Sequence, residues 1–92
     1  MLTTKAKEDA KMWREGTIGI PGKGGKSKIA HYWVRTYSRK SKYGIDGGKI
    51  RELRIEINHE LAARYDRGWI LKPSEDDEPA NIAILICLDQ HN

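Results

Sequence analysis

The sequence predicts an α+β domain in which a four-stranded antiparallel sheet is covered on one face by a C-terminal helix. Residues 49–57 alternate between apolar and charged side chains, as in a strand with one dry and one wet face. Residues 28–37 are rich in β-branched and aromatic side chains, which favour strands. Residues 79–89 begin with a proline and are apolar over most of their length, which is typical of a buried helix. Strands followed by one helix indicate separate α and β layers.

The first two strands are expected to form a hairpin. The first strand covers residues 12–20, and the second covers residues 28–37. Between them, residues 21–27 contain three glycines and a proline, a composition typical of a turn. A long polar connection follows over residues 38–48, in which Asp46-Gly47 is a turn signal.

The later strands complete a meander in sequence order. A turn at residues 58–60 joins the third strand to a fourth strand over residues 61–71. Regular alternation along the fourth strand would turn Arg67 inward, so a bulge is expected near Gly68. This segment also suggests that Arg67 stacks on a tryptophan, in a cation–π contact.

The helix over residues 79–89 follows an acidic run at residues 75–78, and negative charge is favourable at a helix N-terminus. A strand over residues 82–88 is the alternative, because β-branched residues are frequent there. The expected core combines apolar side chains of the last two strands and the helix: Leu53, Ile55, Ile57, Tyr65, Trp69, Ile82, Leu85 and Ile86.

The length of 92 residues predicts a single domain over residues 12–92, preceded by a flexible or short helical leader over residues 1–11. No apolar run approaches the roughly 20 residues of a membrane span, and the first residues lack the apolar stretch of a signal peptide. We therefore expect a cytoplasmic protein.

The net charge of +4 is divided unevenly along the chain. Residues 1–54 contain 14 Lys/Arg and 5 Asp/Glu, whereas residues 55–92 contain 3 and 8. This asymmetry favours one of two interpretations: a face that binds nucleic acid, or two halves that fold together with their charges in solvent.

The residues that could carry chemistry do not form a catalytic or metal-binding pattern. His31, His59, His91 and Cys87 are scattered without ligand spacing, and Cys87 lies in an apolar run that suits a buried side chain. The glycine-rich loop at residues 21–27 lacks a glycine of the phosphate-binding pattern and precedes a strand rather than a helix. We expect no enzyme activity, no metal and no cofactor.

A basic stretch at residues 35–43 is the candidate binding surface. Its cations could neutralise phosphates and its tyrosines could stack on bases, whereas Tyr and Arg also anchor protein interfaces. An exposed loop that only keeps the protein soluble is the alternative. Lysines of the preceding loop, Lys23, Lys26 and Lys28, are expected to extend this surface. The candidate residues are Arg35, Tyr37, Arg39, Lys40, Lys42 and Tyr43.

Several short motifs occur in a fixed order along the chain: Trp13-(two residues)-Gly16-Thr17, Tyr43-Gly44-Ile45, Lys49-Ile50, Leu53, Ile55, Tyr65-Asp66-Arg67-Gly68-Trp69 and Pro73. This pattern resembles a family of small uncharacterised proteins encoded largely by phages, prophages and conjugative elements of Gram-positive bacteria. The resemblance covers residues 12–73, departs at the lysine-rich loop and at Ile70, and implies an accessory protein of a mobile element without a known activity.

The function expected from these observations is a non-catalytic, macromolecule-binding accessory protein of a phage or mobile element. An inhibitor of a host defence system, similar to an anti-CRISPR protein, is one form of this hypothesis. The partner is then a protein. The alternative is a small nucleic-acid-binding module that uses residues 35–42. The sequence leaves the oligomeric state open.

Overall fold

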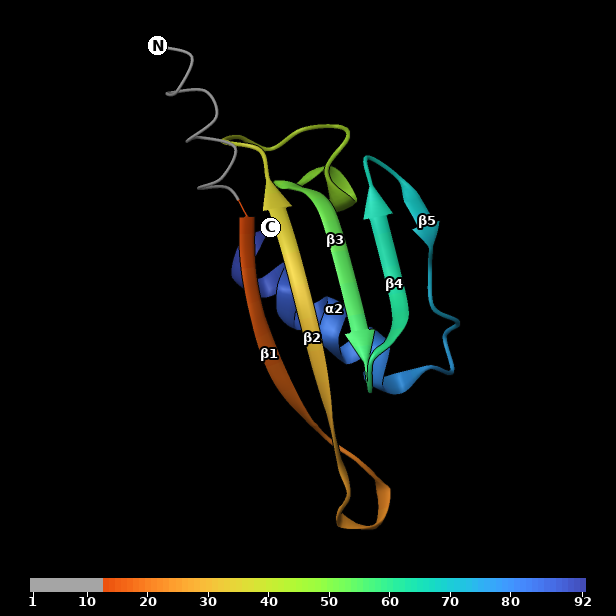
Figure 1. Cartoon of the computed structure of the whole chain (residues 1–92). Helices are drawn as coiled ribbons and strands as arrows, with labels where there is room; N and C mark the ends of the chain where they lie inside the picture. Colours follow the sequence, from red (N-terminus) through yellow and green to blue (C-terminus); the bar gives the residue numbers. More distant parts are fainter. Residues whose placement is uncertain (1–12) are drawn as a thin grey trace.

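The computed structural model describes residues 13–92, and the leader expected at residues 1–11 lies outside them. One antiparallel sheet with the strand order β1-β2-β3-β4-β5 carries α2 across one of its faces (Figure 1). The strands are β1 (Trp13–Pro21), β2 (Ser27–Thr36), β3 (Ile50–Ile57), β4 (Glu60–Asp66) and β5 (Trp69–Leu71); the helices are α2 (Glu78–His91) and the short 3₁₀ turns η1 (Lys23–Gly25) and η2 (Ile45–Gly47).

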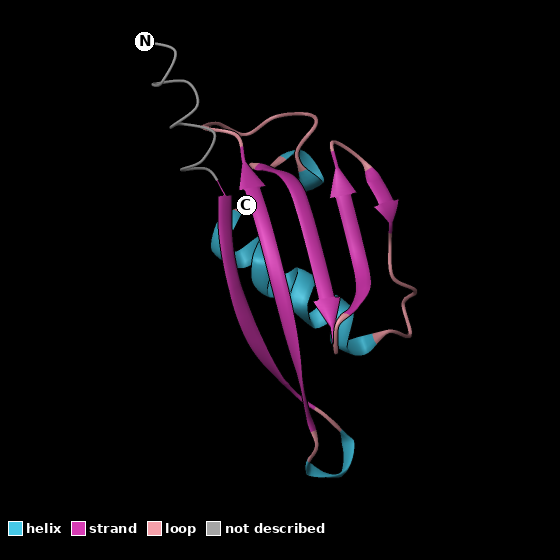
Figure 2. Ribbon diagram, in the orientation of Figure 1, coloured by secondary structure: helices cyan, strands magenta, loops and turns pink. Residues whose placement is uncertain are grey.

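The predicted α+β class, antiparallel sheet and C-terminal helix are confirmed, but the predicted number of four strands is wrong (Figure 2). The segment expected as one strand over residues 61–71 turns back at Arg67, whose φ is 57°. The Asp66 N–H donates to the Gly68 carbonyl over 2.9 Å and closes this turn. Arg67 therefore lies exposed at a hairpin tip, and the irregularity in pairing falls between Arg64 and Tyr65 rather than at Gly68.

The turn between β3 and β4 has the geometry that the sheet twist prefers. Ile57 pairs with Glu60, so only Asn58 and His59 lie between the strands. Both have positive φ, 52° and 67°, as in the two-residue hairpin turns that match the right-handed twist of the strands. Asparagine and histidine adopt positive φ more readily than most residues, which explains how the turn forms without glycine.

The core lies between α2 and the face of the sheet that α2 covers. Of the predicted core, Leu53, Ile55 and Tyr65 are buried. The residues Ile57, Trp69, Ile82 and Ile86 are half-buried. Leu85 was placed wrongly, because 64% of its surface is exposed. The buried side chains of the helix are instead Ala80, Ala83, Ile84 and Cys87.

The rotation of α2 could not be chosen from the sequence. Apolar residues surround most of the helix, so no single stripe marks the buried side. Ala83, Ile84 and Cys87 of the helix belong to the same core cluster as the buried strand residues, so this side of the helix packs against the sheet. Burial raises the pKa of the Cys87 thiol to about 12, so this cysteine is a packed apolar residue, as predicted.

Asn92 ties the end of α2 to the connection between β2 and β3. Its side-chain oxygen accepts from the Ile50 N–H over 3.0 Å, and its side-chain nitrogen donates to the Ile45 carbonyl over 2.9 Å. A Cβ at Gly48 would collide with the Asn92 amide, so glycine is needed there for close approach. The helix and the η2 turn are thereby fixed to each other. No described helix is long and apolar enough to cross a membrane.

The different exposures of Ile55 and Leu85 give a direct test of the core. Ile55→Ala removes buried methyl groups and leaves a cavity, so the free energy of unfolding should fall by about 2–5 kcal/mol. Leu85→Ala, on the exposed side of α2, should change it by less than about 0.5 kcal/mol. Denaturant titration measures both. Equal losses from the two variants would contradict the orientation of the helix.

The stability of the fold should also depend on the protonation of His91. Its ring lies 5.8 Å from the Tyr32 ring, between centroids, and its Nε2 is buried without a hydrogen bond to the described residues. Burial first, and then the charge of Arg14, hold the pKa of His91 below its ordinary value of 6.5. The unfolded chain therefore takes up this proton more readily than the folded chain. Stability should be complete above about pH 6.5 and should fall as the pH drops below it.

The thermal unfolding midpoints of the native chain and of His91→Gln can be compared from pH 8 to about 5. Both chains have the same carboxylates, so the difference between the two curves reports the titration of His91. The native midpoint should fall more steeply below about pH 6.5 than that of the variant. Parallel curves would show that His91 does not titrate differently in the folded chain.

Candidate binding face

The face of the sheet opposite α2 carries tryptophans and charged residues. The register aligns Trp13, Arg35 and Glu52 in one row across the strands, and Glu15, Trp33, Arg54 and Arg64 in the next. Successive residues of a strand point to opposite faces, so these rows share the uncovered side. We call it the open face, which consists of Trp13, Glu15, Thr17, His31, Trp33, Arg35, Glu52, Arg54, Glu56 and Arg64.

Trp33 lies at the centre of a chain of contacts across three strands. The His31 ring stacks on it with centroids 4.0 Å apart and planes inclined by 6°. The Nε2 atom of His31 also lies 2.6 Å from Oε2 of Glu15. The Arg54 guanidinium carbon lies 5.6 Å from the Trp33 ring centroid. Arg54 in turn donates from Nη2 and Nε to Glu56, over 2.7 and 3.0 Å.

A second chain of contacts runs beside the first. The Arg35 guanidinium carbon lies 5.7 Å from the Trp13 ring centroid. Arg35 donates to Glu52 over 3.3 Å, and Arg64 approaches the other oxygen of Glu52 to 3.9 Å. The Glu52 side chain is only 13% exposed, so this carboxylate is held between two arginines. Each indole of the open face thus has a guanidinium beside it.

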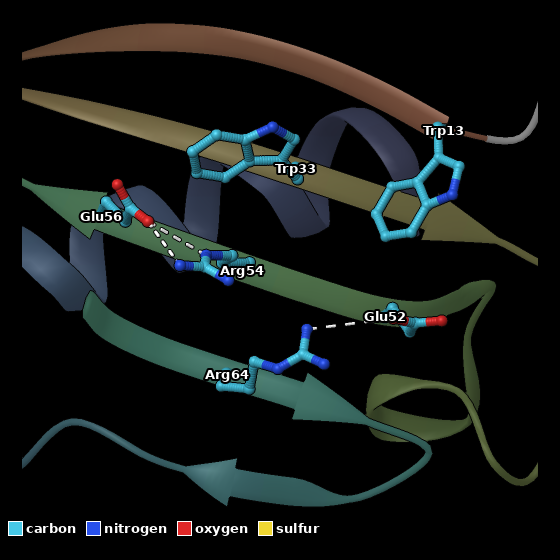
Figure 3. Close-up of a pocket in the computed structure, with 6 residues that line it drawn as sticks. All are labelled: Trp13, Trp33, Glu52, Arg54, Glu56 and Arg64. Carbon is cyan, nitrogen blue, oxygen red and sulfur yellow. Dashed lines mark hydrogen bonds and ion pairs between the residues drawn. The ribbon is translucent and has the colours of Figure 1, made fainter. Parts of the chain in front are cut away.

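These residues surround a shallow hollow of about 530 Å³ (Figure 3). The indoles of Trp13 and Trp33 come from β1 and β2, and the charged side chains of β3 and β4 lie opposite them. The lining residues are Trp13, Trp33, Glu52, Arg54, Glu56 and Arg64. The hollow therefore combines apolar ring surface with hydrogen-bonding groups that their neighbours hold in place.

The charges of the open face nearly cancel. Each of its three arginines contacts a glutamate of the same face, and Glu15 adds a further carboxylate. A surface for a polyanion needs an excess of cations, which this face lacks. Exposed Trp and Arg are the residues on which protein interfaces concentrate binding energy, and 40% of the Trp13 surface is exposed. Solvent-facing sides of antiparallel sheets are normally polar, so two indoles here are unusual.

The basic stretch predicted as the binding surface is divided in the structure. Arg35 lies in β2 on the open face, and Tyr37 follows the strand, its N–H donating to the Lys49 carbonyl over 2.8 Å. The remaining candidates lie exposed in the connection between β2 and β3: Arg39, Lys40, Lys42 and Tyr43.

Tyr43 joins this connection to the core. Its carbonyl accepts from the Tyr65 hydroxyl over 2.8 Å, while its own side chain is 53% exposed. The Lys42 ammonium lies 5.2 Å from the centroid of the Tyr43 ring. Desolvation, helped by Tyr37 and Asp46, raises the pKa of Tyr65, so its hydroxyl stays protonated and can donate. The tyrosine and the lysine thus form an exposed pair on an anchored backbone.

Lys26 and Lys28 cannot extend this surface, contrary to expectation. They lie at the hairpin end of β2, and Arg39 and Lys40 follow its other end. Ten residues of strand, about 33 Å at 3.3 Å per residue, separate the two groups. Arg67 was likewise expected to stack on a tryptophan, but Arg35 and Arg54 hold those positions.

The open face is not marked by any group of residues that are neighbours along the chain. Trp13, Trp33 and Arg64 come from three strands and meet only through the sheet register. The alternation of Glu52, Arg54 and Glu56 did mark one face of β3 as charged. The described residues contain no group of three or more His, Cys, Asp or Glu that could hold a metal ion.

A family model described as a domain of unknown function, DUF7678, matches residues 12–92. Neither the curated proteins nor the solved structures include a significant match to the chain.

The Tyr65–Tyr43 hydrogen bond should fix the connection that carries Arg39 to Tyr43. Tyr65→Phe removes this donor and should lower the free energy of unfolding by about 0.5–1.5 kcal/mol. Amide hydrogen exchange should accelerate in residues 41–48 more than in β3. Tyr43→Phe, which loses only an exposed hydroxyl, is the control and should match the native chain. Unchanged exchange in Tyr65→Phe would show that the connection is held by other contacts.

Proposed function

The chain belongs to the DUF7678 family, whose function is unknown, and from this premise we propose that it acts by binding another protein through the open face. The observation that carries the proposal is the pair of Trp13, which is exposed, and Trp33, which is half-buried, each with an arginine against its ring. Rigid aromatic anchors beside charged groups are typical of the residues that dominate interface energies.

The contacts within the open face support binding by a preformed surface. Arg54 is held by Glu56, and Arg35 by Glu52, so these long side chains lose less conformational freedom when a partner binds. His31 stacks on Trp33 and fixes one side of the indole in the same way. A partner that suits this face presents apolar or aromatic groups for the indoles, with carbonyl or carboxylate oxygens for the guanidinium edges.

The proposal includes an accessory role in a phage or mobile element. Inhibition of a host defence protein is one form that this role could take. The resemblance of residues 12–73 to proteins of mobile elements suggests this setting. A small protein can inhibit an enzyme without chemistry of its own when it covers a functional surface of that enzyme. The hollow of the open face, about 530 Å³ in volume, offers a place where a side chain of the partner could anchor.

Nucleic-acid binding through the connection between β2 and β3 is the second candidate. Arg39, Lys40 and Lys42 are exposed, and no ion pair joins them to a carboxylate among the described residues. Such cations are available to phosphates, and Tyr43 could stack on a base. This segment suits a polyanion better than the near-neutral open face does.

Capture experiments can separate the two candidates. The native chain, the face variant Trp33→Ala/Arg54→Ala and the loop variant Arg39→Ala/Lys40→Ala/Lys42→Ala are immobilised and exposed to lysate of the organism that encodes the chain. Retained proteins are identified, purified and titrated against each form by calorimetry. Circular dichroism and thermal unfolding verify that both variants are folded.

A protein partner should bind the native chain and the loop variant alike. The face variant should bind it at least about 30-fold more weakly, corresponding to about 2 kcal/mol at a hot spot. A partner that binds the face variant with native affinity would contradict the proposal. Retention of nucleic acid that is lost in the loop variant, and whose affinity falls steeply with salt, would establish the second candidate instead.

A further inference from the structure

The two edges of the sheet differ in how they are protected. β5 is only three residues long and is followed by Lys72 and Pro73, features that discourage further strand pairing. β1 is nine residues long and pairs with β2 over its whole length without a register shift. Within residues 13–92, no strand pairs with the outer side of β1 (Figure 1).

The composition of β1 does not protect this edge. Proteins usually blunt an exposed edge with lysine, proline, a bulge or a short strand. β1 contains no lysine, and its single proline, Pro21, is at its end. Its charges are confined to Arg14 and Glu15, so residues 16–20 are a run of uncharged glycine, threonine and isoleucine. Among residues 13–92, no strand takes up the outer backbone groups of residues 15–20 in β1, so this part of the edge can accept another strand.

We propose that β1 pairs antiparallel with β1 of a second copy, to form a two-fold symmetric dimer with one continuous ten-stranded sheet. This inference goes beyond the proposed function and concerns the sheet edge rather than the open face. Closed two-fold dimers are the commonest protein oligomers, and a strand edge can satisfy their symmetry by pairing with itself.

The sequence of β1 selects one register for this pairing. If the two-fold axis is perpendicular to the sheet, the α2 helices of both copies lie on the same side of the joined sheet. Residues that pair across the axis then point to the same face of the sheet. Centring the axis on Thr17 gives every residue of β1 a partner, from Trp13 opposite Pro21 to Thr17 opposite Thr17. A threonine pair of this kind is favourable between strands.

The charges agree with the same register. With the axis at Thr17, Arg14 lies opposite Ile20 of the copy, and Glu15 opposite Gly19. A shift of the axis to Glu15 would place two glutamates opposite each other, which is unfavourable, and would leave the uncharged end of the strand unpaired. The same symmetry places the two open faces on one side of the dimer, where they could engage a partner together.

Engineered cysteines test the dimer and its register. Thr17→Cys should form a disulfide-linked dimer on mild oxidation, because opposite residues in antiparallel strands lie within disulfide distance. Glu15→Cys alone should not, since two Glu15 positions would be roughly 13 Å apart along the strands. A mixture of Glu15→Cys and Gly19→Cys should cross-link, and a Cβ at Gly19 meets no atom within 4 Å. The native Cys87 is buried and should not interfere.

Light scattering on the native chain gives an independent readout. The native chain should have twice the mass of one chain at high concentration, and Thr17→Lys and Thr17→Glu should each be monomers. Mixing these two variants should restore a dimer, since opposite charges then meet across the axis. Ile70→Lys, on the opposite edge, is the control and should remain dimeric. A native chain that stays monomeric, with Thr17→Cys unlinked, would overturn the proposal and would leave the open face untouched by the result.

Discussion

Packing of α2 against one side of the sheet determines where the other side chains of the molecule can lie. Ala83, Ile84 and Cys87 pack with the strands in the core, and Asn92 fixes the end of the helix to the connection between β2 and β3. Within residues 13–92, α2 is the only helix that covers the sheet, and no described element covers the opposite side. The indole, guanidinium and carboxylate groups on this side contact one another and are not separate solvated charges.

The open face and the edge of β1 are both consequences of this single-layer arrangement. A sheet with helices on both sides would hide Trp13 and Trp33, and a sixth strand would satisfy the outer side of β1. The contacts of the open face hold its side chains in place without neutralising the apolar ring surface. A surface of this kind suits recognition of another protein, and pairing through β1 would double it.

Local patterns of the sequence predicted the class of fold and most strands correctly. Alternation at residues 49–57 fixed the facing of β3, and the buried Leu53 and Ile55 agree with it. The break at Arg67 was missed because an arginine with positive φ is uncommon and no Asn-Gly or similar pair marks the turn. Leu85 was misplaced because α2 is apolar nearly all round. The open face depends on the register of four strands, which no local pattern contains.

Binding of a partner protein at the open face can be tested directly through the tryptophan side chains. The chain has three tryptophans, Trp13 and Trp33 on the open face and Trp69 on the side packed against the core, so their indole N–H signals report the two sides separately. Two-dimensional NMR of the labelled chain, with and without the protein recovered by capture, makes this comparison. If a partner binds at the open face, the Trp13 and Trp33 indole N–H signals should shift or broaden, and the chemical shift of the Trp69 signal should not change. Movement of the Trp69 signal alone would contradict binding at the open face.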